Sequence, residues 1–184
     1  MSAIIEQPAA DEYAAWAADY VRRAGEADVL DTLTRQTDEF GQAFAGLSDQ
    51  DGLFRFAPKE WSIKEVVGHV CDFERIFFYR MLCVSRNETA ALPGFDQDDY
   101  VRGTSFDERN LDELVQEFQI VRRANLLTLK HFSAEVSLRC GTVSGNPFSV
   151  RALVYCMAGH VYYHLNDFKT LYLPGLKKDK PASS

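Results

Sequence analysis

Apolar residues recur at steps of three and four along four long segments of this chain. The first of these segments runs from Val29 to Leu47 and the last from about Ser149 to Leu173. Such spacing places the apolar side chains on one face of an α-helix. The pattern therefore predicts four amphipathic helices, and a shorter amphipathic stretch from Asp11 to Ala24 predicts one extra helix before them.

The second predicted helix has the clearest start in the chain. The Ser62 side chain can accept a hydrogen bond from the amide of Glu65, and the Glu65 side chain can return to the amide of Ser62, which makes a capping box. From residue 63 to about residue 86 the apolar positions keep helical spacing. The third helix follows another possible capping box, Asn110 to Glu113, and is predicted to end near His131.

The connections between these helices differ in character. Residues 87–104 are rich in Pro, Gly and Asp, and Pro93-Gly94 is a turn signal, so we expect a loop over one end of the bundle. Between Ala134 and Pro147 apolar residues alternate with polar ones over a short stretch that also contains glycines. This pattern predicts a small hairpin or an extended crossover. Pro174-Gly175 is predicted to end the last helix. Together these features predict an all-α fold built on a four-helix bundle.

Composition fits one domain with one core. The chain has 184 residues, of which 46% are hydrophobic, and we divide it into an N-terminal extension (1–28), a four-helix-bundle domain (29–175) and a disordered tail (176–184). Its net charge of -7, without a basic patch, argues against a nucleic-acid partner. No long apolar run or signal peptide is present, so we expect a cytoplasmic protein without a membrane partner. The four cysteines are scattered singly and are expected to be reduced thiols.

Histidines supply the candidate chemistry. His160 and His164 are four residues apart in the last predicted helix, so their imidazoles share its inward face. His69 occupies the inward stripe of the second helix. Three neutral imidazoles bind zinc, nickel, copper or iron and leave a position open for water or substrate. The alternative is that each is a core histidine satisfied by a tyrosine or a backbone carbonyl, and His131 is interpreted as a surface residue.

Other polar residues are weaker candidates. Val161 follows the first histidine of the pair, where zinc peptidases place a glutamate, so that class is rejected. Asp72 and Asp167 can accept the second N–H of a metal-bound imidazole, or else lie on a solvated helix face. Asp96 is a candidate general base at the mouth of the site, or else a turn residue. Cys156 can approach the ion, although a small buried apolar side chain is the simpler description.

From about Val29 to Leu173 the chain resembles the DinB/YfiT-like family of metalloenzymes. Six stretches carry the resemblance: Ala57 to His69, Glu74-Arg75, Tyr79-Arg80, Leu92 to Asp98, Ser149 to Leu153, and Gly159-His160 with His164. Together these stretches are specific, whereas the histidine pair alone is not. Val161 and Tyr163 depart from the acidic and histidine residues that the family often has in its last motif.

The resemblance implies an up-down-down-up four-helix bundle, often a homodimer, with a nickel or zinc ion held by His69, His160 and His164. It implies first a thiol-dependent S-transferase that acts on a small molecule with a low-molecular-weight thiol such as bacillithiol or mycothiol. A thiol-dependent maleylpyruvate isomerase also belongs to the family. Two alternatives stay open, a metal-dependent hydrolase of a small substrate and a stress-associated metal-binding protein without catalysis.

Overall fold

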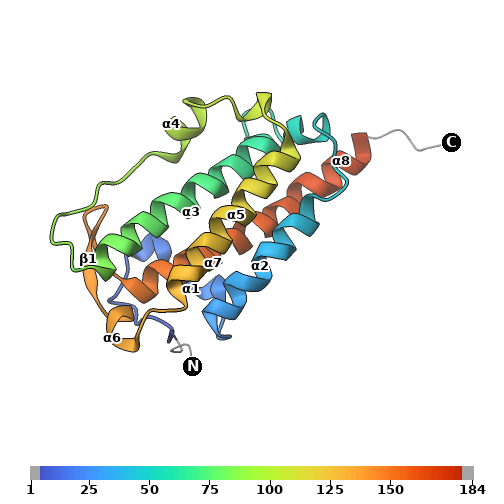
Figure 1. The fold of residues 1–184 in the computed structure, drawn as a ribbon. Helices are drawn as coiled ribbons and strands as arrows, with labels where there is room; N and C mark the ends of the chain where they lie inside the picture. Colours follow the sequence, from blue (N-terminus) through green and yellow to red (C-terminus); the bar gives the residue numbers. More distant parts are fainter. Residues whose placement is uncertain (1–4, 180–184) are drawn as a thin grey trace.

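The computed structural model describes residues 5–179, and four long helices lie side by side in it (Figure 1). They are α2 (Val29–Phe44), α3 (Ile63–Ser85), α5 (Leu111–Leu129) and α7 (Val150–Asp167). The shorter elements are η1 (Ala15–Ala17), α1 (Ala18–Ala24), η2 (Asp51–Leu53), α4 (Gln97–Arg102), η3 (Phe106–Glu108), α6 (Ala134–Ser137), β1 (Cys140–Val143) and β2 (Asn146–Ser149). The two strands pair antiparallel as a hairpin. The predicted all-α fold and its small hairpin are confirmed.

The helices α3 and α5 run parallel to each other. Asp49 pairs with Lys64 at the start of α3 and accepts a hydrogen bond from the amide of Leu111 at the start of α5. Further along both helices, Glu74 of α3 pairs with Arg122 of α5. Parallel neighbours need a long connection, and the crossover that carries α4 supplies it (Figure 1).

The helices α2 and α7 form the second parallel pair. Gln36 of α2 donates to the carbonyl of Ala158 in α7. Further along both helices, Phe44 at the end of α2 packs against Phe168, which follows α7 directly. Figure 1 shows α3 and α7 running in opposite directions. The resulting order is up-down-down-up, with α3 packed between α5 and α7.

The crossover between α3 and α5 is more ordered than a plain loop. It contains α4, whose first turn is capped by the Asp96 side chain accepting from the amide of Asp99 at 2.9 Å. Leu92 forms a β-bridge with Val143, which ties the crossover to the hairpin. The prediction of a loop over residues 87–104 missed this helix because one turn and a half carries too few apolar positions to show a period.

The last helix does not end at Pro174-Gly175 as predicted. After α7 the chain makes a π-helical turn, Phe168–Tyr172, and continues as α8 (Leu173–Asp179). Pro174 therefore lies within a continuous helical run, two residues after the π-helical turn. The helix α8 includes the first residues of the predicted tail, as far as Asp179. Within it, Leu176 is buried in the core. The rest of that predicted tail, 180–184, lies outside the described residues.

A chain of buried polar groups links all four long helices. Arg122 donates to both carboxylate oxygens of Glu74 at 2.8 and 2.7 Å, and Asn125 donates to the same carboxylate. Arg122 also donates to Gln36, whose amide nitrogen donates to the carbonyl of Ala158. A buried ion pair is tolerated when its remaining hydrogen-bonding capacity is filled, and here it is. The network fixes the lateral position of the helices.

The short helix α1 lies directly on α7. A Cβ built on Gly159 would stand 1.8 Å from the carbonyl oxygen of Tyr20, so the two backbones touch where no side chain fits. Val21 and Ala24 on the same face of α1 are buried in the core. The N-terminal extension is therefore part of the packed interior.

We expect Gly159→Ala to destabilise the protein. The added methyl meets backbone that cannot rotate away, so α1 must shift, which costs about 1 to 3 kcal/mol and exceeds the gain in helix propensity. Thermal unfolding monitored by circular dichroism measures the change. Gly41→Ala is the matched control, because its Cβ meets only the end of the flexible Gln119 side chain. Equal stability of the two variants would contradict the packing described for α1.

Candidate metal centre

Capping residues fix where the two histidine-bearing helices begin. Ser62 accepts from the amide of Glu65, and the Glu65 side chain accepts from the amide of Ser62, so the predicted capping box is present at the start of α3. Ser149 accepts from the amide of Ala152 at the start of α7. A fixed first turn sets the rotation of the helix, and rotation decides which side chains point inward.

A glycine precedes two of the three histidines. At Gly68 a Cβ would stand 2.4 Å from the ring of Phe106, and at Gly159 it would strike the backbone of Tyr20. Neighbouring elements therefore press directly against α3 and α7 beside His69 and His160. At Gly159 this approach of α1 brings the Tyr20 ring edge-on to His160.

The three predicted histidines converge. Nε2 of His160 lies 3.0 Å from Nε2 of His69 and 3.1 Å from Nε2 of His164. One ligand nitrogen from each residue lies within 4.8 Å of the other two. His69 is 2% exposed and His160 1% exposed, and His164 is half-buried. The imidazoles thus meet at the bundle interior, with His164 nearest to solvent.

Hydrogen bonding alone satisfies this cluster poorly. A neutral imidazole nitrogen carries either one hydrogen or one in-plane lone pair, so Nε2 of His160 cannot make two good hydrogen bonds to two other nitrogens. One cation accepts lone pairs from all three. Nitrogens that are each about 2.0 to 2.1 Å from a shared ion stand about 2.9 to 3.4 Å apart at octahedral to tetrahedral angles. The distances of 3.0 and 3.1 Å match that range, so the residues present fit a divalent metal ion.

Burial keeps the imidazoles neutral, which is the form that binds metal. Loss of hydration lowers the pKa of His69 to about 4 and that of His164 to about 3. The pKa of His160 falls well below its ordinary value, first through burial and then through the neighbouring His164 and His69 and the charge of Arg122. At neutral pH all three therefore offer lone pairs.

Aromatic rings hold the imidazoles in place. The Phe73 ring stacks on His160 at 3.5 Å between centroids and 5° between planes. Trp61 lies 4.8 Å from His69, and Tyr20 stands edge-on to His160 at 5.4 Å. In the sequence, Trp61 directly precedes the Ser62 capping box and Phe73 lies one helical turn after His69, whereas no pattern would bring Tyr20 to the site.

A pocket of about 480 Å³ opens beside the cluster on the His164 side. Its walls combine aromatic side chains with charged and polar ones. The lining residues include Tyr20, Lys59, Glu60, Trp61, Asp98, Tyr163, His164, Asp167 and Tyr172. A small molecule in this pocket reaches His164 directly, whereas His69 and His160 lie behind it.

The two aspartates predicted to support the imidazoles do not do so. Among the described residues, neither Asp72 nor Asp167 makes a hydrogen bond to a histidine, and Nδ1 of His160 is buried without a partner. Asp72 lies instead near Arg75. Asp167 lines the pocket, where burial raises its pKa above the ordinary value against the opposing effect of Asn166 and other neighbours. Of the two alternatives that the sequence left open, hydrogen bonding to the imidazoles is therefore not the one found for either aspartate.

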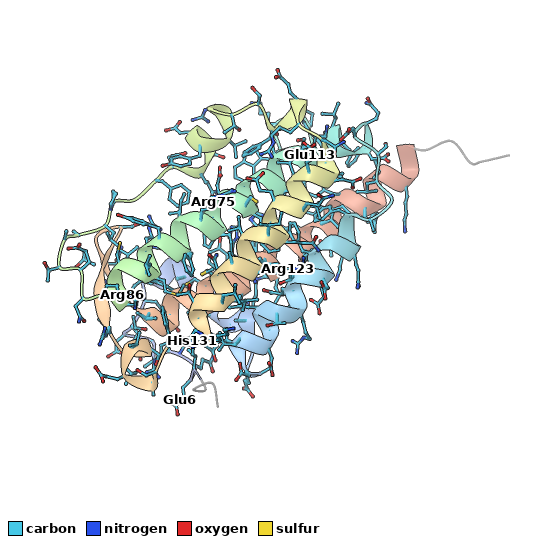
Figure 2. All side chains as sticks on the ribbon, in the orientation of Figure 1. Glu6, Arg75, Arg86, Glu113, Arg123 and His131 are labelled. Carbon is cyan, nitrogen blue, oxygen red and sulfur yellow. The ribbon has the colours of Figure 1, made fainter. Side chains whose placement is uncertain are left out.

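The remaining candidates lie apart from the cluster. The carboxylate of Asp96 caps α4 and lines a neighbouring hollow, not the pocket that contains His164. Cys156 is fully buried, and burial raises the pKa of its thiol. It is not among the residues whose ligand atoms converge. His131 is exposed, as expected, and Figure 2 labels it at the end of α5. All four cysteines are free thiols.

Comparison with known proteins places the chain in a family. A family model described as the DinB superfamily matches residues 32–168. The chain belongs to the DinB superfamily. This confirms the resemblance drawn from the sequence. No curated protein matches the chain. None of the described helices of this DinB-superfamily chain is both long and apolar enough to cross a membrane.

Among solved structures, this DinB-superfamily chain is similar to YfiT from Bacillus subtilis. The match has a TM-score of 0.72 and 12% sequence identity, and it covers 94% of this chain and 93% of that chain. YfiT is described as "a probable metal-dependent hydrolase with an unusual four-helix bundle topology". At this identity the likeness shows a shared fold, and it includes the N-terminal region as well as the bundle.

We expect the metal-free protein to lose stability as the pH falls from about 6.5 towards 4. Histidines of the unfolded chain take up protons near pH 6.5, whereas the pKa values of His69 and His164 are about 4 and about 3 in the folded state. Their contribution is fully present above pH 6.5 and falls by about 2 kcal/mol per histidine between pH 6.5 and 5. Urea unfolding in the presence of a chelator measures this slope.

The matched controls for that measurement are two single variants. His131→Gln should leave the slope unchanged because His131 is exposed. His160→Leu should reduce it because one buried proton acceptor is gone. An equal slope in all three proteins would contradict the burial of the histidine cluster.

Proposed function

We propose that this chain is a metal-dependent hydrolase of a small substrate, with one zinc or nickel ion held by His69, His160 and His164. The convergence of three neutral Nε2 atoms at the inner end of an open pocket carries the proposal. Imidazole ligands suit both metals, and three protein ligands leave room for a reactant.

The pocket supplies the remaining parts of a hydrolytic site. A bound divalent ion polarises a carbonyl and lowers the pKa of a neighbouring water. Asp167 is our candidate general base, because its raised pKa and its place in the pocket wall suit it to accept a proton from that water. Trp61, Tyr20 and Tyr172 line the pocket and offer aromatic surface to a small substrate. Asp96, which caps α4, is less suited to this role.

The lining of the pocket favours water over a thiol as the nucleophile. Glu60, Asp98 and Asp167 outnumber Lys59 there, so the pocket has both a proton acceptor and an acidic character. A water molecule activated beside a metal ion passes its proton most directly to a nearby acceptor, and Asp167 supplies one in this pocket. The thiol-dependent S-transferase implied by the sequence resemblance is therefore the alternative function. It differs from the hydrolase in requiring an added thiol.

Metal content and activity test the proposal together. Purified protein reconstituted with zinc or nickel should hold one ion per chain by elemental analysis. His160→Ala should lose it, and His131→Ala should keep it. The loaded protein should turn over a small ester or amide without thiol. Asp167→Asn should keep the metal and lower kcat by about 10²-fold or more, as expected when a general base is removed.

Three outcomes would contradict parts of this account. Stoichiometric metal in His160→Ala would exclude the histidine cluster as the site. Conjugation of an electrophile that occurs only when a low-molecular-weight thiol is supplied would replace the hydrolase by the S-transferase and leave the metal centre intact. Tight metal binding without turnover in either assay would indicate a metal-binding protein.

A further inference from the structure

Arg80 is a buried cation whose partners are all neutral. Its side chain belongs to α3 and the residue is 3% exposed. Nη2 donates to the carbonyl oxygen of Pro93 at 2.7 Å and contacts the hydroxyl of Ser144 at 3.1 Å. The rings of Phe77 and Phe95 lie 5.0 and 5.3 Å from its guanidinium carbon. Among residues 5–179 no carboxylate forms an ion pair with Arg80.

Arg122, the other buried arginine among the described residues, and the partly buried Arg151 both have carboxylate partners. Arg122 is enclosed with Glu74, which it meets through two hydrogen bonds. Arg151 is likewise paired with Glu12. A buried charge is costly unless an opposite charge or a full set of hydrogen bonds compensates it. Two neutral oxygens and two rings surround Arg80. Nε and Nη1 have no acceptor among the described residues and are not fully buried, so they remain open to a ligand.

Arg80 borders a hollow of about 300 Å³ between α3 and the crossover that carries α4. Its lining residues are Arg75, Ile76, Tyr79, Arg80, Leu92, Pro93, Gly94, Phe95 and Tyr100. Two arginines and no carboxylate line it, and the rest of the wall is apolar or aromatic. Arg75, which Figure 2 labels on α3, is already paired with Glu117, so Arg80 holds the uncompensated charge.

A second hollow touches Arg80 from the other side of the crossover but suits an anion less well. It is lined by Asp96 and Asp98, whose negative charges repel an anionic ligand. The hollow with Arg75 has no such groups, and it shares no lining residue with the pocket beside His164. It is therefore a separate place on the molecule.

We propose that the hollow beside Arg80 binds a small carboxylate with an apolar or aromatic body. The carboxylate supplies the missing counter-charge for Arg80 and accepts from its free N–H groups. Ile76 and Leu92 contact the apolar body, and Tyr79 and Tyr100 offer aromatic faces at the rim. This site is independent of the metal centre and of the reaction proposed there.

Benzoate and benzamide are the probes, because they share a shape and differ in charge. Titration of ¹⁵N-labelled protein, with and without bound metal, should show benzoate shifting the Nε–H signal of Arg80. Benzamide should bind at least about tenfold more weakly, as expected for loss of a charge-assisted hydrogen bond. Failure of benzoate to bind at millimolar concentration, or equal binding of benzamide, would overturn the proposal.

Variants separate the roles of the lining residues. Arg80→Gln should weaken benzoate binding at least about tenfold. Arg80 also holds the crossover through Pro93, so Tyr79→Ala is the second test: Tyr79 is 58% exposed, and its loss should weaken binding without changing the melting temperature. Arg102→Gln, an exposed change on α4, is the control and should bind like the parent. Unchanged affinity in a folded Arg80→Gln, or in Tyr79→Ala when Arg80→Gln does not fold, would exclude this site.

Discussion

Three imidazole nitrogens share one small volume in an apolar interior, and the surrounding structure depends on their remaining neutral. His160 stands between His69 and His164 at distances that hydrogen bonds to both cannot satisfy at once. Protonation is opposed by burial, since a charged imidazole there loses its hydration. A divalent cation removes the conflict because it accepts three lone pairs. The metal proposal thus rests on the chemistry of the donors.

The bundle topology is what brings these donors together. Antiparallel packing of α3 against α7 sets one histidine opposite a pair on the neighbouring helix, and the parallel partners α5 and α2 close the other sides. Gly159 lets α1 approach until the Tyr20 ring meets His160, and Gly68 lets Phe106 pack directly against α3. The buried pair of Glu74 and Arg122 holds the helices laterally. Each of these features acts on the position of the rings, so the site and the fold have a common basis.

Much of this arrangement could be predicted from the sequence because it follows from periodicity. The spacing of His160 and His164 and the capping box at Ser62 determine local rotation, and both are short-range features. The contact of Tyr20 with α7 could not be predicted, since it joins segments far apart in the chain without a pattern in either. The continuation through Pro174 was also missed, because the π-helical turn before it depends on tertiary packing. Asp167 was noticed from its spacing, but that spacing could not show that its carboxylate lines the pocket beside His164.

The most direct test of the metal centre is X-ray absorption spectroscopy of the zinc-loaded protein. Our account predicts a first shell of nitrogen and oxygen atoms at about 2.0 to 2.1 Å, with outer-shell scattering that fits three imidazoles. A sulfur atom at about 2.3 Å would indicate that Cys156 binds the ion instead. That result, or a shell with fewer than three imidazoles, would contradict the central claim.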